Sequence, residues 1–263
     1  MNEKIKIIFF DIDWTLYDHK NQCFNMPSIE LINSLQKRGI KIFLCTARPY
    51  HSALHLGTFE LLKPDGYIVS NGGAVVVENN KVIKSSFFKK EDMDKIYQLT
   101  VDRNLAIECV DVFDRYLLTE KTKEIDILFS SFKEIIPPFR KYDGFPTLAA
   151  LLFAGEEHDE YFINNLPKNI VYKRFADYGV DIVPEEREKG NAIKCVLDYY
   201  NIPKECSMAF GDDFQDISMF NNVGISICLG NGKEEVKKHA TIVTEEIWND
   251  GVKLALEKYK DLF

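Results

Sequence analysis

The sequence has no hydrophobic stretch long enough to cross a membrane. A span needs roughly 18–20 mostly apolar residues, and the longest strictly apolar run here, Leu148 to Ala154, has seven. The first residues, MNEKIKIIFFDID, carry charges where a signal peptide has its apolar region, and no small-residue cleavage site follows them. We therefore expect a cytoplasmic protein that has no membrane partner.

The sequence also has no excess of basic residues. Lys and Arg together number 33, against 41 Asp and Glu, so the formal net charge is −8. A protein that binds nucleic acid normally presents a basic face, and we therefore expect no nucleic-acid partner. A small anionic ligand remains compatible with this balance because it needs only a local site.

Several short signatures of other protein classes are absent. None of the six cysteines forms a C-x-x-C pair, so the sequence predicts neither a zinc clip nor a thioredoxin-type motif. The patterns G-x-x-x-x-G-K-[ST], H-E-x-x-H and G-x-S-x-G do not occur either. P-loop nucleotide binding and the chemistry of the other two patterns are therefore not indicated.

What the sequence does have is the composition of a globular protein, with 46% hydrophobic and 28% charged residues. Its 263 residues exceed one average domain of roughly 100–200 residues. We therefore expect one large α/β unit, or a core that carries an inserted module.

The amino-terminal segment predicts a βαβ unit. An apolar run at 4–10 ends abruptly in acid, as a buried strand does when its carboxyl end carries polar groups. Residues 27–38 have a helical pattern that opens with Pro, and a second apolar run occupies 40–45. Two parallel strands joined in this way require a right-handed crossover.

The remaining pattern divides the chain into a core and an insertion. We expect a helix at 49–62, a strand at 67–70 and a hairpin at 74–84, after which hairpins and helices mix through residue 175. The βα alternation resumes at residue 190, with helices at 190–200, 216–220, 233–239 and 248–259 and strands at 207–210, 225–229 and 241–243. The predicted fold class is α/β: a doubly wound, Rossmann-like parallel-sheet core of residues 1–80 and 185–263, with an inserted α+β cap domain of residues 81–184.

Polar residues follow the predicted core strands. In open α/β sheets, ligands bind outside the carboxyl ends of the strands. The residues expected at that edge are Asp11, Asp13, Thr46, Arg48, Lys189, Asp212 and Asp216. Acids at this density repel each other unless a cation neutralises them, and Mg²⁺ is the natural candidate because it takes oxygen ligands and shares its shell with phosphate.

These residue types suit phosphoryl transfer. Lys and Arg side chains match phosphate oxygens. A carboxylate can attack phosphorus and form an aspartyl phosphate. A second carboxylate two residues further on can protonate the leaving oxygen and later deprotonate water.

In these motifs the chain resembles the haloacid dehalogenase superfamily of Mg²⁺-dependent phosphohydrolases, and most of all its Cof-type branch. The motifs occur in the family's order and are Asp11-Ile12-Asp13-x-Thr15-Leu16, Thr46, Lys189-Gly190 and Gly211-Asp212-Asp213-x-x-Asp216, with Ser70-Asn71-Gly72-Gly73 before the cap. The resemblance covers the whole chain.

The resemblance implies a role for each matching residue. Asp11 is the nucleophile, and Asp13 is the general acid/base, whose main-chain carbonyl also meets the metal. The phosphoryl group is bound by Thr46 and Lys189, with Arg48 and Asn71 facing the same pocket. The metal site comprises Asp11, Asp13, Asp212 and Asp216.

Two positions depart from the pattern of the branch. Trp14 stands where Gly is usual, so its side chain must point away from the ligand. Gln215 stands where Asn usually precedes the last Asp of the fourth motif. The five histidines show no clear metal spacing, and we interpret them as structural or surface residues.

The resulting hypothesis is a Mg²⁺-dependent phosphatase of small phosphorylated metabolites. Sugar phosphates are the favoured substrates, with nucleotides or flavin mononucleotide as alternatives. Two other functions stay open, a phosphomutase of the same superfamily and a catalytically weak regulator that binds a sugar phosphate. A monomer or a weak homodimer is expected.

Overall fold

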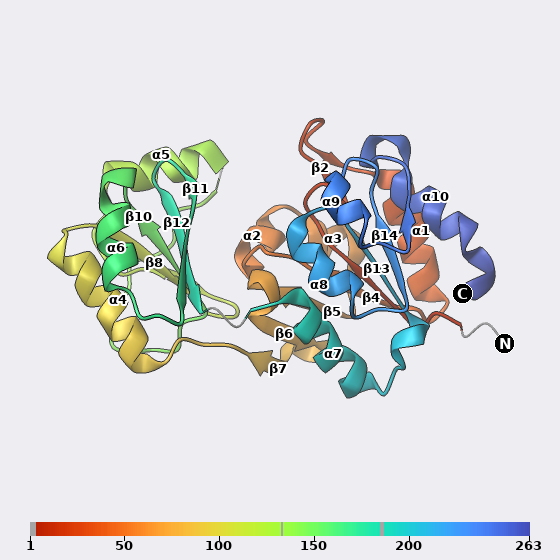
Figure 1. Ribbon diagram of the computed structural model, residues 1–263, viewed down its shortest axis with the longest axis horizontal. Helices are drawn as coiled ribbons and strands as arrows, with labels where there is room; N and C mark the ends of the chain where they lie inside the picture. The colour runs from red at the N-terminus through yellow and green to blue at the C-terminus, as the bar shows by residue number, and fades with distance from the viewer. Residues whose placement is uncertain (1–3, 133, 185–186) are drawn as a thin grey trace. The chain divides into compact units, whose positions relative to one another are not determined.

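A computed structural model describes residues 4–132, 134–184 and 187–263. The chain divides into two compact units (Figure 1). The core unit comprises Met1–Arg48, Leu56–Lys84 and Glu188–Phe263, and the inserted unit comprises Pro49–His55 and Ser85–Arg187. No helix in the described ranges is long and apolar enough to cross a membrane.

The core unit is built on one large sheet. Its strand order is β15-β14-β13-β1-β4-β5-β6-β7. The strands are β1 (Ile7–Phe10), β4 (Lys41–Cys45), β5 (Gly66–Val69), β6 (Ala74–Val77), β7 (Lys81–Ser85), β13 (Ser207–Gly211), β14 (Ile225–Cys228) and β15 (Ile242–Val243). All neighbours from β15 to β5 pair in parallel, whereas β6 runs antiparallel to β5. The chain order reverses beside β1, which makes the carboxyl ends of β1, β4 and β13 the expected ligand-binding edge.

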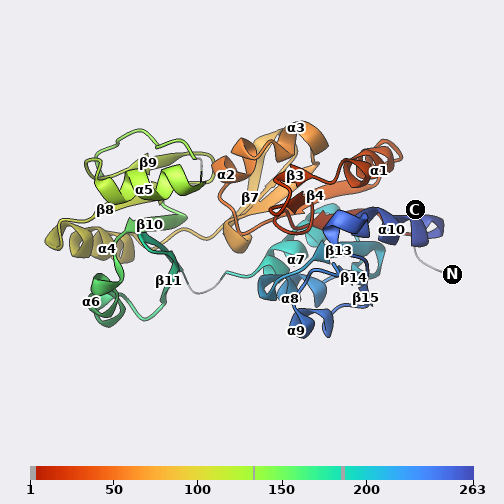
Figure 2. The same ribbon diagram turned by 90° about the horizontal axis from the view of Figure 1, so that it is seen from above.

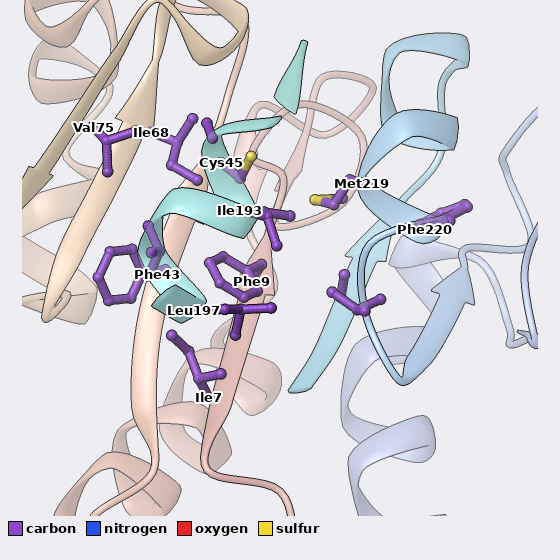
Figure 3. Packing of buried hydrophobic residues seen from close by; sticks show 14 of the residues in the cluster. Ile7, Phe9, Phe43, Cys45, Ile68, Val75, Ile193, Leu197, Met219 and Phe220 are labelled. Atoms are coloured by element: carbon purple, nitrogen blue, oxygen red, sulfur yellow. The ribbon is translucent and has the colours of Figure 1, made fainter. Parts of the chain in front are cut away.

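Both faces of the central strands β1, β4, β5 and β13 are buried, which explains why these strands are almost continuously apolar. Every residue of β1 has an exposed fraction of 0%. On one face, Phe9 and Phe43 pack with Ile193 and Met219, which come from α7 (Lys189–Tyr200) and α8 (Ile217–Phe220) (Figure 3). The other face is covered by α1 (Met26–Lys37) and α3 (Thr58–Leu62), as Figure 2 shows.

The inserted unit has its own sheet and its own core. Its strand order is β11-β12-β10-β8-β9 and its sheet is antiparallel. The strands are β8 (Ala106–Val110), β9 (Arg115–Leu117), β10 (Ala149–Phe153), β11 (Ile170–Ala176) and β12 (Gly179–Pro184). Buried residues of α4 (Lys90–Asp102) and α6 (Asp159–Asn165) pack on one face, and those of α5 (Lys123–Phe132) pack on the other.

The predicted fold class is confirmed, and the differences are local. The helix expected at 49–62 is two helices, α2 (Tyr50–His55) and α3, because the chain turns at Gly57, whose φ is 84°. The helix expected at 248–259 is α10 (Gly251–Lys258), preceded by Asp250 in the left-handed region. A short helix α9 (Glu234–Lys237) lies before β15.

Three strands were not predicted. One is β12, and the others form the small hairpin of β2 (Tyr17–Asp18) and β3 (Cys23–Phe24). The predicted domain boundary at residue 185 lies outside the described residues.

Candidate active site

A buried ion cluster lies at the carboxyl end of β1. The amide N–H of Asp11 donates to the carbonyl of Phe210, which extends the pairing of β1 with β13 by one residue. Lys189, the first residue of α7, donates from Nζ to Asp11 Oδ1 at 2.7 Å and to Asp216 Oδ1 at 2.6 Å. All three side chains are at most 3% exposed. The charge of the lysine therefore offsets two carboxylates that water does not reach.

Burial and neighbouring charge shift the protonation equilibria of this cluster in opposite directions. Burial raises the pKa of Asp11 well above its usual range. Lys189 lowers this pKa, and the nearby acids raise it again in part. Burial by itself would lower the pKa of Lys189, but Asp11 and Asp216 reverse this and raise it. The lysine is therefore a permanent cation beside Asp11.

The loop after β13 holds Asp216 in place and brings Asp212 next to the cluster. Asp216 Oδ2 accepts from the backbone N–H groups of Asp212 (2.9 Å) and Asp213 (3.1 Å). A Cβ atom on Gly211 would lie 2.6 Å from the carboxyl carbon of Asp216, so only glycine allows this approach. Thr15 Oγ1 donates to Asp212 Oδ1 at 2.9 Å. Burial and the nearby Asp216 raise the pKa of Asp212 to about 7 despite the bond from Thr15.

Three of these acids are grouped as metal ligands are. Asp11, Asp212 and Asp216 are buried, and each offers one carboxylate oxygen such that these oxygens lie within 4.8 Å of one another. An all-oxygen donor set of this kind fits a hard divalent cation such as Mg²⁺.

The side chain of Asp13 lies outside this group and makes a separate set of bonds. Arg48 donates from Nε to Oδ2 at 2.8 Å and from its NH2 nitrogen to Oδ1 at 2.7 Å. His19 Nε2 lies 2.6 Å from the same Oδ1. Burial alone would raise the pKa of Asp13, but the bonds and charge of Arg48, together with His19, hold it below its usual value.

The loops after β4 and β5 are tied to each other beside Thr46. The backbone N–H of Arg48 donates to Thr46 Oγ1 at 3.0 Å, and the N–H of Asn71 donates to the carbonyl of Thr46 at 3.1 Å. Asn71 and Ser70 both have positive φ, and the buried atoms Asn71 Oδ1 and Ser70 Oγ have no hydrogen-bond partner. Buried polar atoms are almost always satisfied, so these two atoms are candidates for ligand contacts.

The structure brings Asp11, Asp212 and Asp216 together beside Lys189, and it pairs the fourth predicted acid, Asp13, with Arg48. Two residues beside them were missed by the sequence analysis. Thr15 lies inside the first motif, but its contact with Asp212, 197 residues away, is seen only in the structure. His19 was interpreted as structural or surface, and no spacing in the sequence could have revealed its contact with Asp13.

Comparison with known proteins decides the family. The sequence of residues 8–256 matches the family model of the haloacid dehalogenase-like hydrolases. The chain belongs to this family. It is 27% identical over its full length to the 5-amino-6-(5-phospho-D-ribitylamino)uracil phosphatase YitU of Bacillus subtilis, with 100% of each chain covered.

Solved structures share the fold, among them one from the haloacid dehalogenase (HAD) superfamily. A hypothetical protein from Geobacillus kaustophilus is 27% identical, with a TM-score of 0.90 over 98% of this chain and 100% of that one. The sugar phosphatase BT4131 of HAD subclass IIB is 25% identical, with a TM-score of 0.76 over 98% and 100%. The chain is therefore an enzyme, a phosphatase of the HAD superfamily.

Proposed function

We propose that this HAD phosphatase hydrolyses small phosphorylated metabolites, with Mg²⁺ as cofactor and through an aspartyl phosphate on Asp11. The observation that carries the proposal is the buried cluster of Asp11, Lys189 and Asp216 beside Asp212. A fully buried lysine between two acids is costly to desolvate, and a structural core has no need of it. Perturbed acids gathered at a sheet edge are typical of an active site.

The carboxylates of Asp11, Asp212 and Asp216 are the residues that would hold the metal, and we add the main-chain carbonyl of Asp13 from the motif. When bound, Mg²⁺ neutralises charge that develops on the transferring phosphoryl group. Lys189 adds a positive charge at Asp11 Oδ1, 2.7 Å from its Nζ. This leaves Oδ2 of Asp11 as the attacking oxygen.

The chemistry has two steps. Asp11 Oδ2 forms a bond to phosphorus while the ester P–O bond breaks, and Asp13, in its protonated form, gives a proton to the departing oxygen. The lowered pKa of Asp13 favours its ionised form, which is the form that takes a proton from water in the second step. Water then attacks the aspartyl phosphate, Asp13 takes its proton, and inorganic phosphate and the Asp11 carboxylate are released. Both steps need Asp13 close to the reacting oxygens.

Thr46 and Asn71 are proposed to bind the phosphoryl oxygens. The Thr46 hydroxyl accepts from Arg48 N–H, so its own hydrogen is available to a phosphate oxygen. The Asn71 side-chain oxygen is buried without a partner, which is consistent with an amide that turns toward a ligand and offers its NH₂ group to a phosphate oxygen. Arg48 lies at the same loop, and its charge acts on phosphate while its Nε and NH2 groups hold Asp13.

We assign substrate choice to the cap domain predicted at residues 81–184. Sugar phosphates are the favoured class because YitU and BT4131, by their names, act on a ribityl phosphate and on sugar phosphates. Nucleotides and flavin mononucleotide stay as alternatives.

The test is phosphate release from p-nitrophenyl phosphate and a panel of sugar phosphates, nucleotides and flavin mononucleotide, with Mg²⁺ or with EDTA. Wild type is compared with Asp11→Asn and with Asp92→Asn, a control from the D-x-D sequence at the start of α4. We expect Mg²⁺-dependent turnover that only Asp11→Asn abolishes.

Two results would refute the proposal. Isomerisation of a hexose phosphate without net phosphate release would identify a mutase. Tight binding of a sugar phosphate without turnover, unchanged in Asp11→Asn, would identify a regulator.

A further inference from the structure

Asp13 is bound by two side chains that come from different parts of the core unit. Arg48 follows β4, whereas His19 lies in the turn of the β2–β3 hairpin. Three nitrogen atoms lie within hydrogen-bond distance of Asp13 Oδ1: His19 Nε2 at 2.6 Å, the Arg48 NH2 nitrogen at 2.7 Å and Arg48 Nε at 3.1 Å. Arg48 Nε also donates to Oδ2, at 2.8 Å. The two oxygens of this carboxylate are therefore not equivalent.

The hairpin that carries His19 is organised by local bonds. Asp18 is buried and accepts from the backbone N–H groups of Lys20 (2.8 Å) and Asn21 (3.2 Å) and from the Asn21 amide (2.6 Å). Such a side-chain cap holds a tight turn in one conformation. His19, the next residue, is therefore presented by an ordered backbone.

The imidazole of His19 is also fixed by its neighbours. Its ring lies 4.9 Å from the ring of Tyr17 in an edge-on arrangement and 5.2 Å from the ring of Trp14 in a tilted one. Both distances are in the range at which aromatic pairs attract. Trp14 therefore supports His19 from the position where the Cof-type branch usually has glycine.

We propose that His19 is a positioning residue for Asp13: its Nε2–H occupies Oδ1 and leaves Oδ2 as the oxygen that exchanges a hydrogen with the substrate. Arg48 binds the carboxylate through Nε and its NH2 nitrogen as a fork. His19 adds a donor to Oδ1 from a different segment of the chain, and this second contact fixes the rotation of the carboxylate relative to Arg48. The inference rests on the proposed role of Asp13 as general acid.

Two variants separate the hydrogen bond from the packing. His19→Phe keeps an aromatic ring between Tyr17 and Trp14 but has no donor, and His19→Gln keeps an N–H donor near the position of Nε2. His239→Gln, at an exposed histidine of the core unit, is the control for a general effect of histidine loss. Thermal unfolding of each variant checks that the core unit is folded.

The assay compares kcat/KM for phenyl phosphate and for p-nitrophenyl phosphate. Phenolate is a strong base that needs a proton as it leaves, whereas p-nitrophenolate is a weak base that leaves without one. A positioned acid contributes about 10²–10⁴-fold, so a misoriented Asp13 should lower kcat/KM for phenyl phosphate by roughly tenfold or more. The p-nitrophenyl ester should lose less than about threefold, since it needs little acid catalysis.

We expect this selective loss in His19→Phe, its rescue in His19→Gln and no change in His239→Gln. In the Asp13→Asn background, His19→Phe should have no further effect. An equal loss with both esters, no loss, or failure of Gln to rescue would overturn the inference. Failure of the proposed function has a different signature, which is no turnover by wild type or full activity in Asp11→Asn.

Discussion

Glu108 offers the most quantitative test of the structure, because it is a buried acid without a full partner. It lies in the middle of β8 with an exposed fraction of 2%, and its Oε2 has no hydrogen-bond partner. The nearest cation, Arg115, has its Nε 3.8 Å from Oε1 and donates to Glu134 Oε2 at 2.6 Å instead. Burial therefore raises the pKa of Glu108 to about 8, and Arg115 only partly opposes this.

The sign of the effect on stability follows from linkage. The pKa of Glu108 is higher in the folded than in the unfolded chain, where it is 4.5. The folded state therefore binds the proton more tightly, and the cost of keeping Glu108 protonated in the fold increases as pH rises from 4.5 toward 8. With 1.36 kcal/mol for each pKa unit, the penalty relative to a neutral side chain is about 1 kcal/mol at pH 5 and about 3 kcal/mol at pH 7.

The perturbation is Glu108→Gln, which keeps the shape of the side chain and removes its charge. Both tryptophans, Trp14 and Trp248, lie in the core unit, so tryptophan fluorescence does not report directly on β8. Hydrogen exchange of peptides from β8 and β10 does so at each pH. The penalty grows by about 2 kcal/mol between pH 5 and pH 7, so the ratio of exchange rates, wild type over variant, should grow by roughly 30-fold.

The control is Glu120→Gln, which removes an exposed glutamate of the same unit and should leave the ratio unchanged. If the ratio for Glu108→Gln does not vary between pH 5 and pH 8, the buried acid is not the source of the effect, and the reasoning is refuted.

Three further predictions concern the core unit. Lys189→Met leaves the buried carboxylates of its two partners uncompensated, so the free energy of unfolding should fall by about 3–5 kcal/mol; a loss below about 1 kcal/mol in urea unfolding, followed by tryptophan fluorescence, would contradict this. Asn231 donates to the carbonyl of Trp14 at 2.8 Å and accepts from the N–H of Ile247 at 2.9 Å. Asn231→Ala should therefore cost about 1–2 kcal/mol in the same assay, and more than Asn249→Ala. Mg²⁺ at 100 times its Kd should stabilise wild type by about 2.7 kcal/mol, and an equal stabilisation of Asp212→Asn would argue against this acid as a ligand.

The sequence by itself determined the fold class and the residue types of the site. Two apolar runs end in the polar residues Asp11 and Thr46. Because both faces of a doubly wound sheet are covered, such polar residues are expected at the edge where the strands end. The order of the motifs then indicated the family. These features are local or follow from chain order, so they need no knowledge of distances.

Tertiary structure decided which side chains touch. Lys189 comes from a charged segment of the sequence, yet it is 0% exposed because its ammonium group lies between Asp11 and Asp216. His19 meets Asp13 only because the β2–β3 hairpin folds back, and this hairpin is too short to give a periodic signal. The break at Gly57 was missed because a turn, and not the helix preference of the residues around it, ends the helix there. The strand β12 was missed because pairing with β10 and β11 determines it more than intrinsic strand preference does. Contacts between residues far apart in the chain depend on how the helices and strands pack. This packing brings the ammonium group of Lys189 within hydrogen-bond distance of both Asp11 and Asp216.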